Sequence, residues 1–182
     1  MNPIKPQDIV VLLKVSLIEG MDWTQRDLAK ALFLSASEVN HALKRLELGR
    51  LYNKREKRIF RRNTYEVLIY AVRHIFPVEL GARKRGIPTA HWFLSDRISF
   101  SPSEIYVWPS LLGKAKGESV QPLYPTAPKA AQKDPALHQL LALVDSLRVG
   151  QVRERNLAKE RLEELIVGND SFREHSKNRN AA

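Results

Sequence analysis

Two short segments near the start of the chain repeat apolar residues three or four positions apart, which is the period of one helix face. The apolar positions are Leu28, Ala29 and Leu32 in the first segment and Val39, Leu43 and Leu46 in the second. Only a few residues separate the two segments. The pattern therefore predicts two short helices, joined by a turn, whose apolar faces pack together.

Each segment also begins with the residues of a helix cap. Thr24 precedes the first segment with Asp27 three residues later, and Ser35 precedes the second with Glu38 in the matching position. In such a capping box the hydroxyl and the acid each accept a backbone N–H of the first turn. The two boxes predict helix starts at Thr24 and Ser35, as in a helix-turn-helix.

The outer face of the second helix is short, polar and cationic. Asparagine can bond two adenine atoms together, serine can bond several base edges, and lysine can reach guanine or a phosphate. We therefore expect this face to contact DNA bases, and an ordinary solvated face of a protein-binding helical hairpin is the alternative. The predicted base contacts are Ser35, Ala36, Ser37, Asn40, His41 and Lys44.

A basic ribbon is predicted directly after this helix, which Gly49 ends. Apolar pairs at 51–52 and 59–60 bracket a polar stretch, as in a two-stranded ribbon with its tip between residues 53 and 58. Residues 44–62 hold nine Lys or Arg against two Glu, and the whole chain has a net charge of +10. Most of the excess charge therefore lies in this segment.

Clustered positive charge of this kind favours a polyanion such as a phosphate backbone. A solvated charge run, or a surface that binds RNA or an acidic protein, remains the alternative. The predicted phosphate contacts are Thr24, Arg45, Lys54, Arg55, Lys57, Arg58, Arg61 and Arg62.

The order of helix, helix and basic ribbon resembles the winged helix-turn-helix of MarR-like bacterial transcriptional regulators, over residues 7–76. An amphipathic helix predicted over residues 7–19 would be the scaffold helix of that fold. The turn of a helix-turn-helix usually carries glycine, whereas this chain has Phe33; the departure favours the winged form. The resemblance implies a homodimer that binds double-stranded DNA.

A further helix is predicted from Thr64 to Phe76, with Asn63 and Glu66 as its capping box. It is apolar nearly all round, which indicates burial or a dimer seam. Eight of the ten prolines then fall between residues 77 and 135, together with several aromatic residues. We expect an irregular, extended segment there, with short strands near Trp92–Leu94 and Tyr106–Trp108.

The end of the chain is predicted to form a helical hairpin. Asp134 can cap a helix that runs to about Val149, and a last helix spans roughly Val152 to Val167. The predicted organisation is a DNA-binding domain (1–76), an irregular segment (77–135), a hairpin for dimer or partner contact (136–168) and a polar tail (169–182). The fold class is therefore mainly α.

One basic, glycine-flanked stretch, Gly81 to His91, is a candidate anion-binding loop. Backbone N–H groups and the side chains of Arg83, Lys84 and Arg85 could together bind a phosphate. The alternatives are an arm that follows DNA and a plain surface loop.

Composition excludes several classes of protein. The chain has no cysteine, its five histidines lack metal-ligand spacing, and it carries no P-loop, dinucleotide or nucleophile-elbow motif. We therefore expect no metal, no cofactor and no enzymatic activity. No apolar run is long enough for a membrane span and no signal peptide is evident, so a cytoplasmic location is expected.

These features predict a sequence-specific, double-stranded DNA-binding regulator, a homodimeric repressor of its own operon, with an antitoxin-like or defence-associated variant by analogy. The alternative is a protein-interaction adaptor whose basic ribbon binds RNA or an acidic partner.

Overall fold

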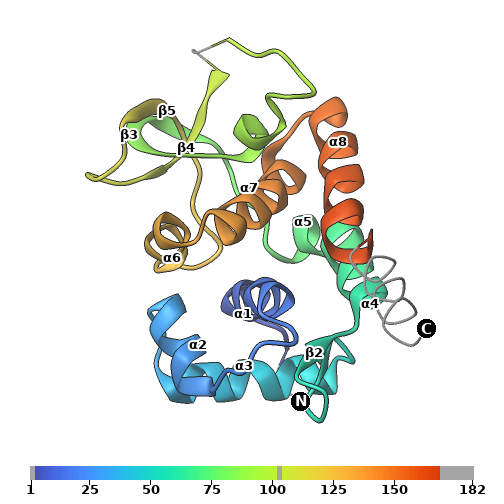
Figure 1. The fold of residues 1–182 in the computed structure, drawn as a ribbon. Coiled ribbons are helices and arrows are strands. Elements are labelled where there is room, and N and C mark those ends of the chain that lie inside the picture. The colour runs from blue at the N-terminus through green and yellow to red at the C-terminus, as the bar shows by residue number, and fades with distance from the viewer. Residues whose placement is uncertain (1–2, 102–103, 169–182) are drawn as a thin grey trace, which may run out of the picture.

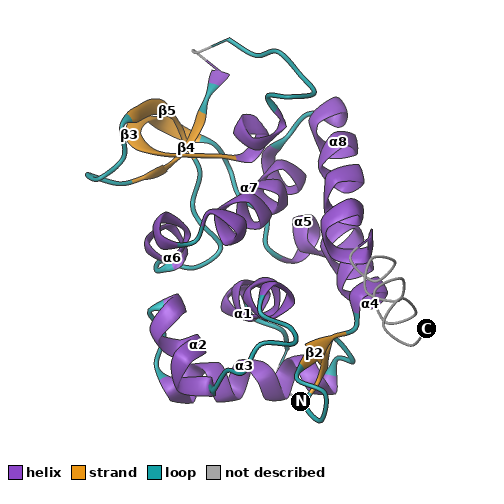
Figure 2. Cartoon of the chain, viewed as in Figure 1, coloured by secondary structure: helices purple, strands orange, loops and turns teal. Residues whose placement is uncertain are grey.

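The computed structural model describes residues 3–101 and 104–168. Within these ranges the chain is mainly helical, as predicted, and it also forms a two-stranded ribbon and a separate three-stranded sheet (Figures 1 and 2). One hydrophobic core extends from Ile9 in the first helix to Ile166 near the end of the described residues. The predicted tail, 169–182, lies outside the described residues.

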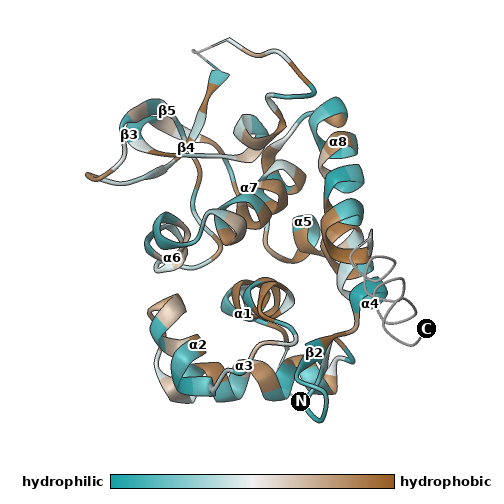
Figure 3. Cartoon of the chain, in the orientation of Figure 1, coloured by the Kyte–Doolittle hydropathy of each residue, from teal (hydrophilic) through white to brown (hydrophobic). Residues whose placement is uncertain are grey.

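The first helix, α1 (Pro6–Leu17), lies at the centre of the fold (Figure 1). It packs against α3 (Ala36–Leu48) on one side and α7 (Pro135–Val149) on the other, and every residue from 8 to 13 is buried. Figure 3 accordingly shows hydrophobic residues over much of α1 and α7. The predicted helix is confirmed, although it ends at Leu17 rather than at residue 19.

The helix-turn-helix segment forms as the caps predict. α2 (Gln25–Leu32) begins after Thr24 and α3 (Ala36–Leu48) after Ser35, with both capping boxes closed. Phe33 takes the left-handed conformation, φ 55°, that glycine usually supplies at this turn. The chain therefore makes the turn without glycine.

The basic ribbon is short. β1 (Tyr52–Asn53) pairs antiparallel with β2 (Arg58–Ile59), and Tyr52 lies opposite Ile59. Both of these side chains are buried, whereas residues 54–58 are exposed. The ribbon thus packs on the helices by its base and presents its charged tip to solvent, as predicted.

A helix follows the ribbon, but it starts earlier than predicted. It comprises α4 (Arg61–Glu66), a π-helical stretch (Val67–Ala71) and α5 (Val72–Ile75). The predicted capping box at Asn63 is wrong because that residue lies inside the helix. Its side-chain amide donates instead to the carbonyl of Arg50 at 2.9 Å, which ties the helix to the start of the ribbon.

The prediction of an irregular segment at 77–135 is wrong. Residues 77–135 contain a three-stranded sheet. The first half of β3 (Gly81–Thr89) pairs with β5 (Ala115–Ser119) and its second half with β4 (Tyr106–Pro109), while β4 and β5 pair in parallel. The predicted strand at Tyr106–Trp108 is confirmed, but Trp92–Leu94 lies in a 3-10 helix. The elements are β3 (Gly81–Thr89), the 3-10 helix (Ala90–Leu94), β4 (Tyr106–Pro109), β5 (Ala115–Ser119) and α6 (Ala127–Lys133).

The physical reason for this error is that frequent proline excludes long helices but not short strands. Pro88 is the second-last residue of β3 and Pro109 the last of β4, so each missing N–H falls near a strand end and leaves most of the ladder intact. The charged run in β3 also lacks the apolar alternation that marks a half-buried strand. Its partners lie far along the chain, so the pairing is not a local property.

The C-terminal hairpin is confirmed: α7 (Pro135–Val149) packs against α8 (Val152–Leu162), which continues as a π-helical stretch (Glu163–Val167). Asp134 caps α7 and accepts the N–H of Leu137 at 3.0 Å. α7 is buried on nearly all sides, against α1, α6, α8, the 3-10 helix and β3. Of the two hairpin helices, α8 therefore offers the larger open surface to a partner.

Candidate nucleic-acid interface

The outer face of α3 is open to solvent. Val39, Leu43 and Leu46 are buried against the rest of the fold, so the opposite side of the helix faces outward. We call the residues on that side the α3 face: Ala36, Ser37, His41 and Lys44 are exposed, and Asn40 is half-buried. Figure 1 shows α3 along the lower edge of the molecule, with α1 above it.

The polar side chains of the α3 face keep their hydrogen-bonding capacity. In the described part of the chain, Ser37, Asn40 and Lys44 make no hydrogen bond or ion pair. Their donors and acceptors are therefore satisfied by solvent and can be exchanged for a ligand without breaking an internal contact.

The two cap hydroxyls differ from these side chains. Ser35 Oγ donates to Glu38 at 2.8 Å and accepts the N–H of Glu38 at 3.1 Å. Thr24 Oγ1 does the same with Asp27, at 2.7 and 3.2 Å. Both hydroxyls are already used within the chain, so their role in this region is to start the helices.

The ribbon tip carries the most accessible cations of the region. Lys54 and Arg55 are exposed and unpaired in the described residues. Lys57 Nζ donates to the carbonyl of Trp23 at 3.0 Å and lies 5.5 Å from its ring centroid. Arg58 pairs with Glu56 at the surface. The tip therefore presents several cations with one acid among them.

Two predicted phosphate contacts lie in buried ion pairs. Arg45 donates to the Asp8 carboxylate from Nε and Nη2, at 2.7 and 2.6 Å, and this hydrogen bonding raises the pKa of the guanidinium. Arg61 pairs with buried Glu19, which also accepts the N–H of Ile59 at 2.7 Å. These pairs hold α1 against α3 and the ribbon, and they remove Arg45 and Arg61 from the candidate phosphate contacts.

Arg62 is exposed, unlike Arg45 and Arg61, but it is also paired, unlike Lys54 and Arg55. Its side chain is 60% exposed and pairs with Glu163 at 3.1 Å. A surface pair of this kind contributes little to stability and exchanges readily with another anion. Arg62 therefore stays among the candidate phosphate contacts.

The predicted anion loop is a strand instead. Arg83, Lys84 and Arg85 lie in β3, whose backbone pairs with β5 at these positions, so its N–H groups do not form an anion nest. All three side chains are exposed. Arg85 Nε donates to the carbonyl of Gly113 at 2.6 Å, and Arg83 donates to that of Lys116 at 3.2 Å. The three cationic side chains are therefore presented by a sheet rather than by a loop.

His91, at the end of the same stretch, is buried. It packs against the rings of Phe100 and Tyr106, with centroids 4.7 and 4.8 Å away, and its Nδ1 lies 3.7 Å from Glu154. Burial lowers the pKa of His91. It is thus a core histidine rather than part of an open site.

Sequence reasoning missed the contacts that join α2 and α3 to the second half of the chain. The Tyr124 hydroxyl donates to Glu38 at 2.7 Å, and Thr126 Oγ1 donates to the carbonyl of Leu32 at 2.9 Å. Hydrogen bonds from the Ser35 N–H and from Tyr124 lower the pKa of Glu38. No local signal predicts such contacts, because the partners lie 86 and 94 residues apart.

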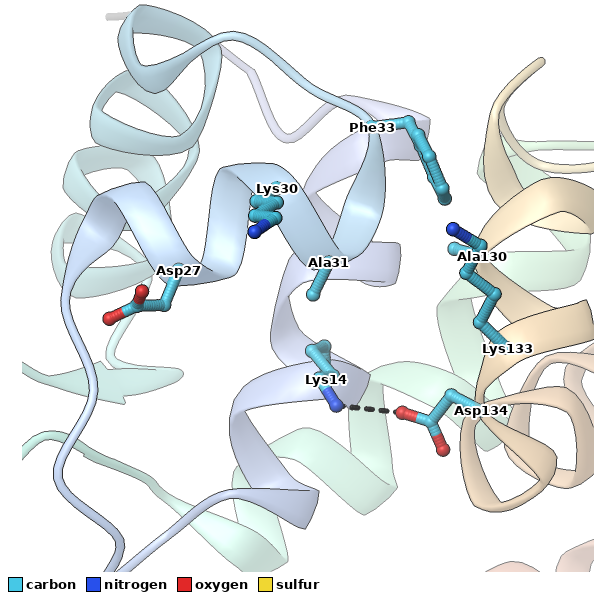
Figure 4. Close-up of a pocket in the computed structure, with 8 residues that line it drawn as sticks. All are labelled: Lys14, Asp27, Lys30, Ala31, Phe33, Ala130, Lys133 and Asp134. Carbon is cyan, nitrogen blue, oxygen red and sulfur yellow. Dashed lines mark hydrogen bonds and ion pairs between the residues drawn. The ribbon is translucent and has the colours of Figure 1, made fainter.

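A pocket of about 590 Å³ lies beside this junction, between α2 and α6 (Figure 4). Its walls carry Lys14, which pairs with Asp134 at 2.7 Å, and Lys30. Lys129 and Lys133 lie over the ring of Phe33, at 4.2 and 5.0 Å. Cation–π contacts from α6 therefore hold Phe33, the residue with the left-handed backbone conformation, in place.

No protein-family model, curated protein or solved structure matches this chain. In residues 3–101 and 104–168, no group of three or more His, Asp or Glu side chains could hold a metal ion. No helix in that part of the chain has both the length and the apolar character to cross a membrane.

Proposed function

We propose that this chain is a sequence-specific, double-stranded DNA-binding transcriptional regulator of the winged helix-turn-helix type, and a homodimeric repressor of its own operon. One observation carries the proposal: an exposed, internally unpaired polar face on α3 lies directly before an exposed cationic ribbon. The helix would enter the major groove while the ribbon binds the phosphate backbone.

Within this proposal the α3 face selects the sequence. Asn40 has the donor and acceptor needed to bond adenine N6 and N7, and Ser37 and Lys44 lie one turn away on either side. The ribbon supplies affinity through Lys54, Arg55 and their neighbours, and these phosphate contacts carry no sequence information.

A second copy would give the complex two recognition helices. The helix between the ribbon and β3 buries Leu68 and Val72, yet leaves Tyr70 and Ile75 exposed at 70% and 55%. We propose this apolar surface, with the adjoining open side of α8, as the dimer seam. Two copies would bind two half-sites about one DNA turn, roughly 34–36 Å, apart.

The test is binding to the duplex upstream of the protein's own gene, compared with a scrambled duplex, across a salt series. Asn40→Ala should weaken specific binding by about 1–3 kcal/mol, and Gln132→Ala, at an exposed position on α6, is the matched control. Arg55→Ala should weaken both duplexes alike and lower the salt slope by about one. Light scattering should report a dimer that Tyr70→Glu dissociates.

Equal affinity for the two duplexes would contradict sequence-specific binding. Absence of binding at moderate salt, together with tight binding of single-stranded RNA, would favour the adaptor alternative. A monomer at micromolar concentration would reject the proposed seam.

A further inference from the structure

The turn between β4 and β5 exposes two adjacent leucines. Leu111 is 92% exposed and Leu112 74%, the highest values of any large hydrophobic residue in the described ranges. Single exposed apolar residues are normal on protein surfaces, but an adjacent pair at a protruding tip is a mark of an interaction site. Figure 1 places this turn at the free end of the sheet, away from α3.

This tip is held in place by the sheet. Ser110 N–H donates to the Arg85 carbonyl at 3.2 Å, and Gly113 N–H donates to the Ser110 carbonyl at 3.2 Å. Gly113 also lies so close to Gly86 that a Cβ built on it would be 2.0 Å from the Gly86 carbonyl. The leucines are therefore displayed by a fixed turn, which reduces the entropy lost when a partner binds them.

A groove lies next to the leucine tip. It has a volume of about 400 Å³, and Leu112 forms part of its wall. Its other apolar walls are Ile87, Pro109, Pro122, Pro125 and Pro128. Proline side chains have almost no rotamer freedom to lose, so such a groove suits the insertion of an apolar side chain.

The surface around the tip is cationic. Arg85 lies directly opposite Lys116 in the β3–β5 ladder, and like charges in that position destabilise a sheet. Lys114 is exposed in the adjoining turn, and Lys129 lies on the groove wall. Glu118, opposite Arg83, is the acid in the same ladder. This unbalanced charge is explained if the surface binds an anionic partner.

We propose that the leucine tip and the proline groove form a docking surface for an acidic segment of another protein, one that carries apolar side chains between its carboxylates. The apolar side chains would contact Leu111, Leu112 and the groove, and the carboxylates would pair with the surrounding cations. A second copy of this chain is the wrong occupant, because two such cationic surfaces repel each other. The surface is separate from the α3 face and does not depend on DNA binding.

A displayed library of random peptides provides the test, with the full chain as bait and Leu111→Ser/Leu112→Ser as the counter-selection. Enriched peptides should be acidic and should contain large apolar residues. Made synthetically, they should bind the double variant and Lys114→Glu/Lys116→Glu at least roughly tenfold more weakly than the original chain. Met21→Ser, at an apolar side chain 63% exposed between α1 and α2, is the matched control and should bind normally.

Thermal melts should be the same for the double variant and the original chain, because both leucines are exposed; this separates lost docking from lost folding. The proposal is overturned if no peptide is enriched, or if enriched peptides are basic or bind the variants equally well. It is also overturned if Leu111→Ser/Leu112→Ser abolishes self-association in light scattering, or abolishes binding to phosphatidylglycerol vesicles. Those results would assign the tip to a second copy or to a lipid surface.

Discussion

The indole Nε1 of Trp108 donates a hydrogen bond of 2.6 Å to the carboxylate of Asp145, which joins β4 to the buried helix α7. The same carboxylate accepts the Thr89 hydroxyl at 2.9 Å and pairs with Arg148 at 2.7 Å. Arg148 in turn donates to the carbonyl of Phe76 at 2.9 Å. One aspartate therefore fastens the sheet and the chain after α5 to the same helix.

Asp145→Asn is expected to lower the free energy of unfolding by about 3 kcal/mol. Arg148 would be left as a buried cation without its counter-charge, and removing one partner of a buried pair typically costs about 3–5 kcal/mol. Urea unfolding measures the change. Asp22→Asn, at an exposed position, should alter stability by less than about 0.5 kcal/mol. A similar small change for Asp145→Asn would show that the network is not stabilising.

Arg45→Gln is expected to destabilise the fold without changing the salt dependence of DNA binding. Asp8, its partner, is 0% exposed, so losing Arg45 leaves a buried carboxylate uncompensated at a cost of about 3 kcal/mol. Arg55→Ala should leave the melting temperature unchanged and should make the affinity for DNA less dependent on salt concentration. Measuring both quantities for both variants separates the structural arginine from the phosphate-binding one. A reduced salt slope for Arg45→Gln would place Arg45 on the DNA after all.

Stability should fall as the solution is acidified below about pH 6.5. Burial lowers the pKa of His138 from its ordinary 6.5, although Pro88 and Asp145 oppose the shift, and burial also lowers that of His91. Both histidines stay neutral in the fold but take up a proton when it unfolds. Their stabilising contribution is thus complete above the unfolded pKa and is lost as the pH falls through the folded one.

Melting temperatures between about pH 5 and pH 8 test this linkage. His138→Gln should make the melting temperature depend less steeply on pH, because glutamine has no proton to take up on unfolding. His41→Gln is the matched control, since His41 is exposed on α3, and its curve should follow that of the original chain. A melting temperature that rises on acidification would refute the sign of the effect.

Gly86→Ala should disrupt the three-stranded sheet. A Cβ there would lie 2.1 Å from the carbonyl oxygen of Trp108, so the β3–β4 backbones would have to separate. Gly49→Ala is the control, because its Cβ would meet nothing closer than 3.4 Å. Hydrogen exchange of the β3 and β4 amides should rise sharply in the first variant only. Unchanged protection would show that the sheet tolerates the added methyl group.

The first half of the fold could be predicted because its signals are local. The Thr24–Asp27 and Ser35–Glu38 boxes each connect residues three apart, and the apolar stripes of α2 and α3 repeat within one turn. Interactions over that distance form in the helix itself, whatever the rest of the chain does. The same reasoning failed at Asn63, where a valid cap pattern lost to a start at Arg61 that the Arg61–Glu19 pair holds in the core.

The candidate interface was only partly predictable for the same reason. The outward-facing positions of Ser37, Asn40 and Lys44 on α3 follow from the helix period alone. The burial of Arg45 and Arg61 does not, because their acidic partners lie 37 and 42 residues away. A count of positive charges along the sequence therefore included two arginines that serve the core.

By itself, the sequence determined where α1, α2, α3, the ribbon and the hairpin form, because caps, glycines and helical periodicity act within a few residues of each other. Tertiary structure alone decided that β3, β4 and β5 form a sheet and that α7 is buried. It also decided that Leu111 and Leu112 are left exposed in the turn between β4 and β5. Those outcomes depend on which distant segments meet, and on the competition among them to bury apolar surface while pairing every buried polar group.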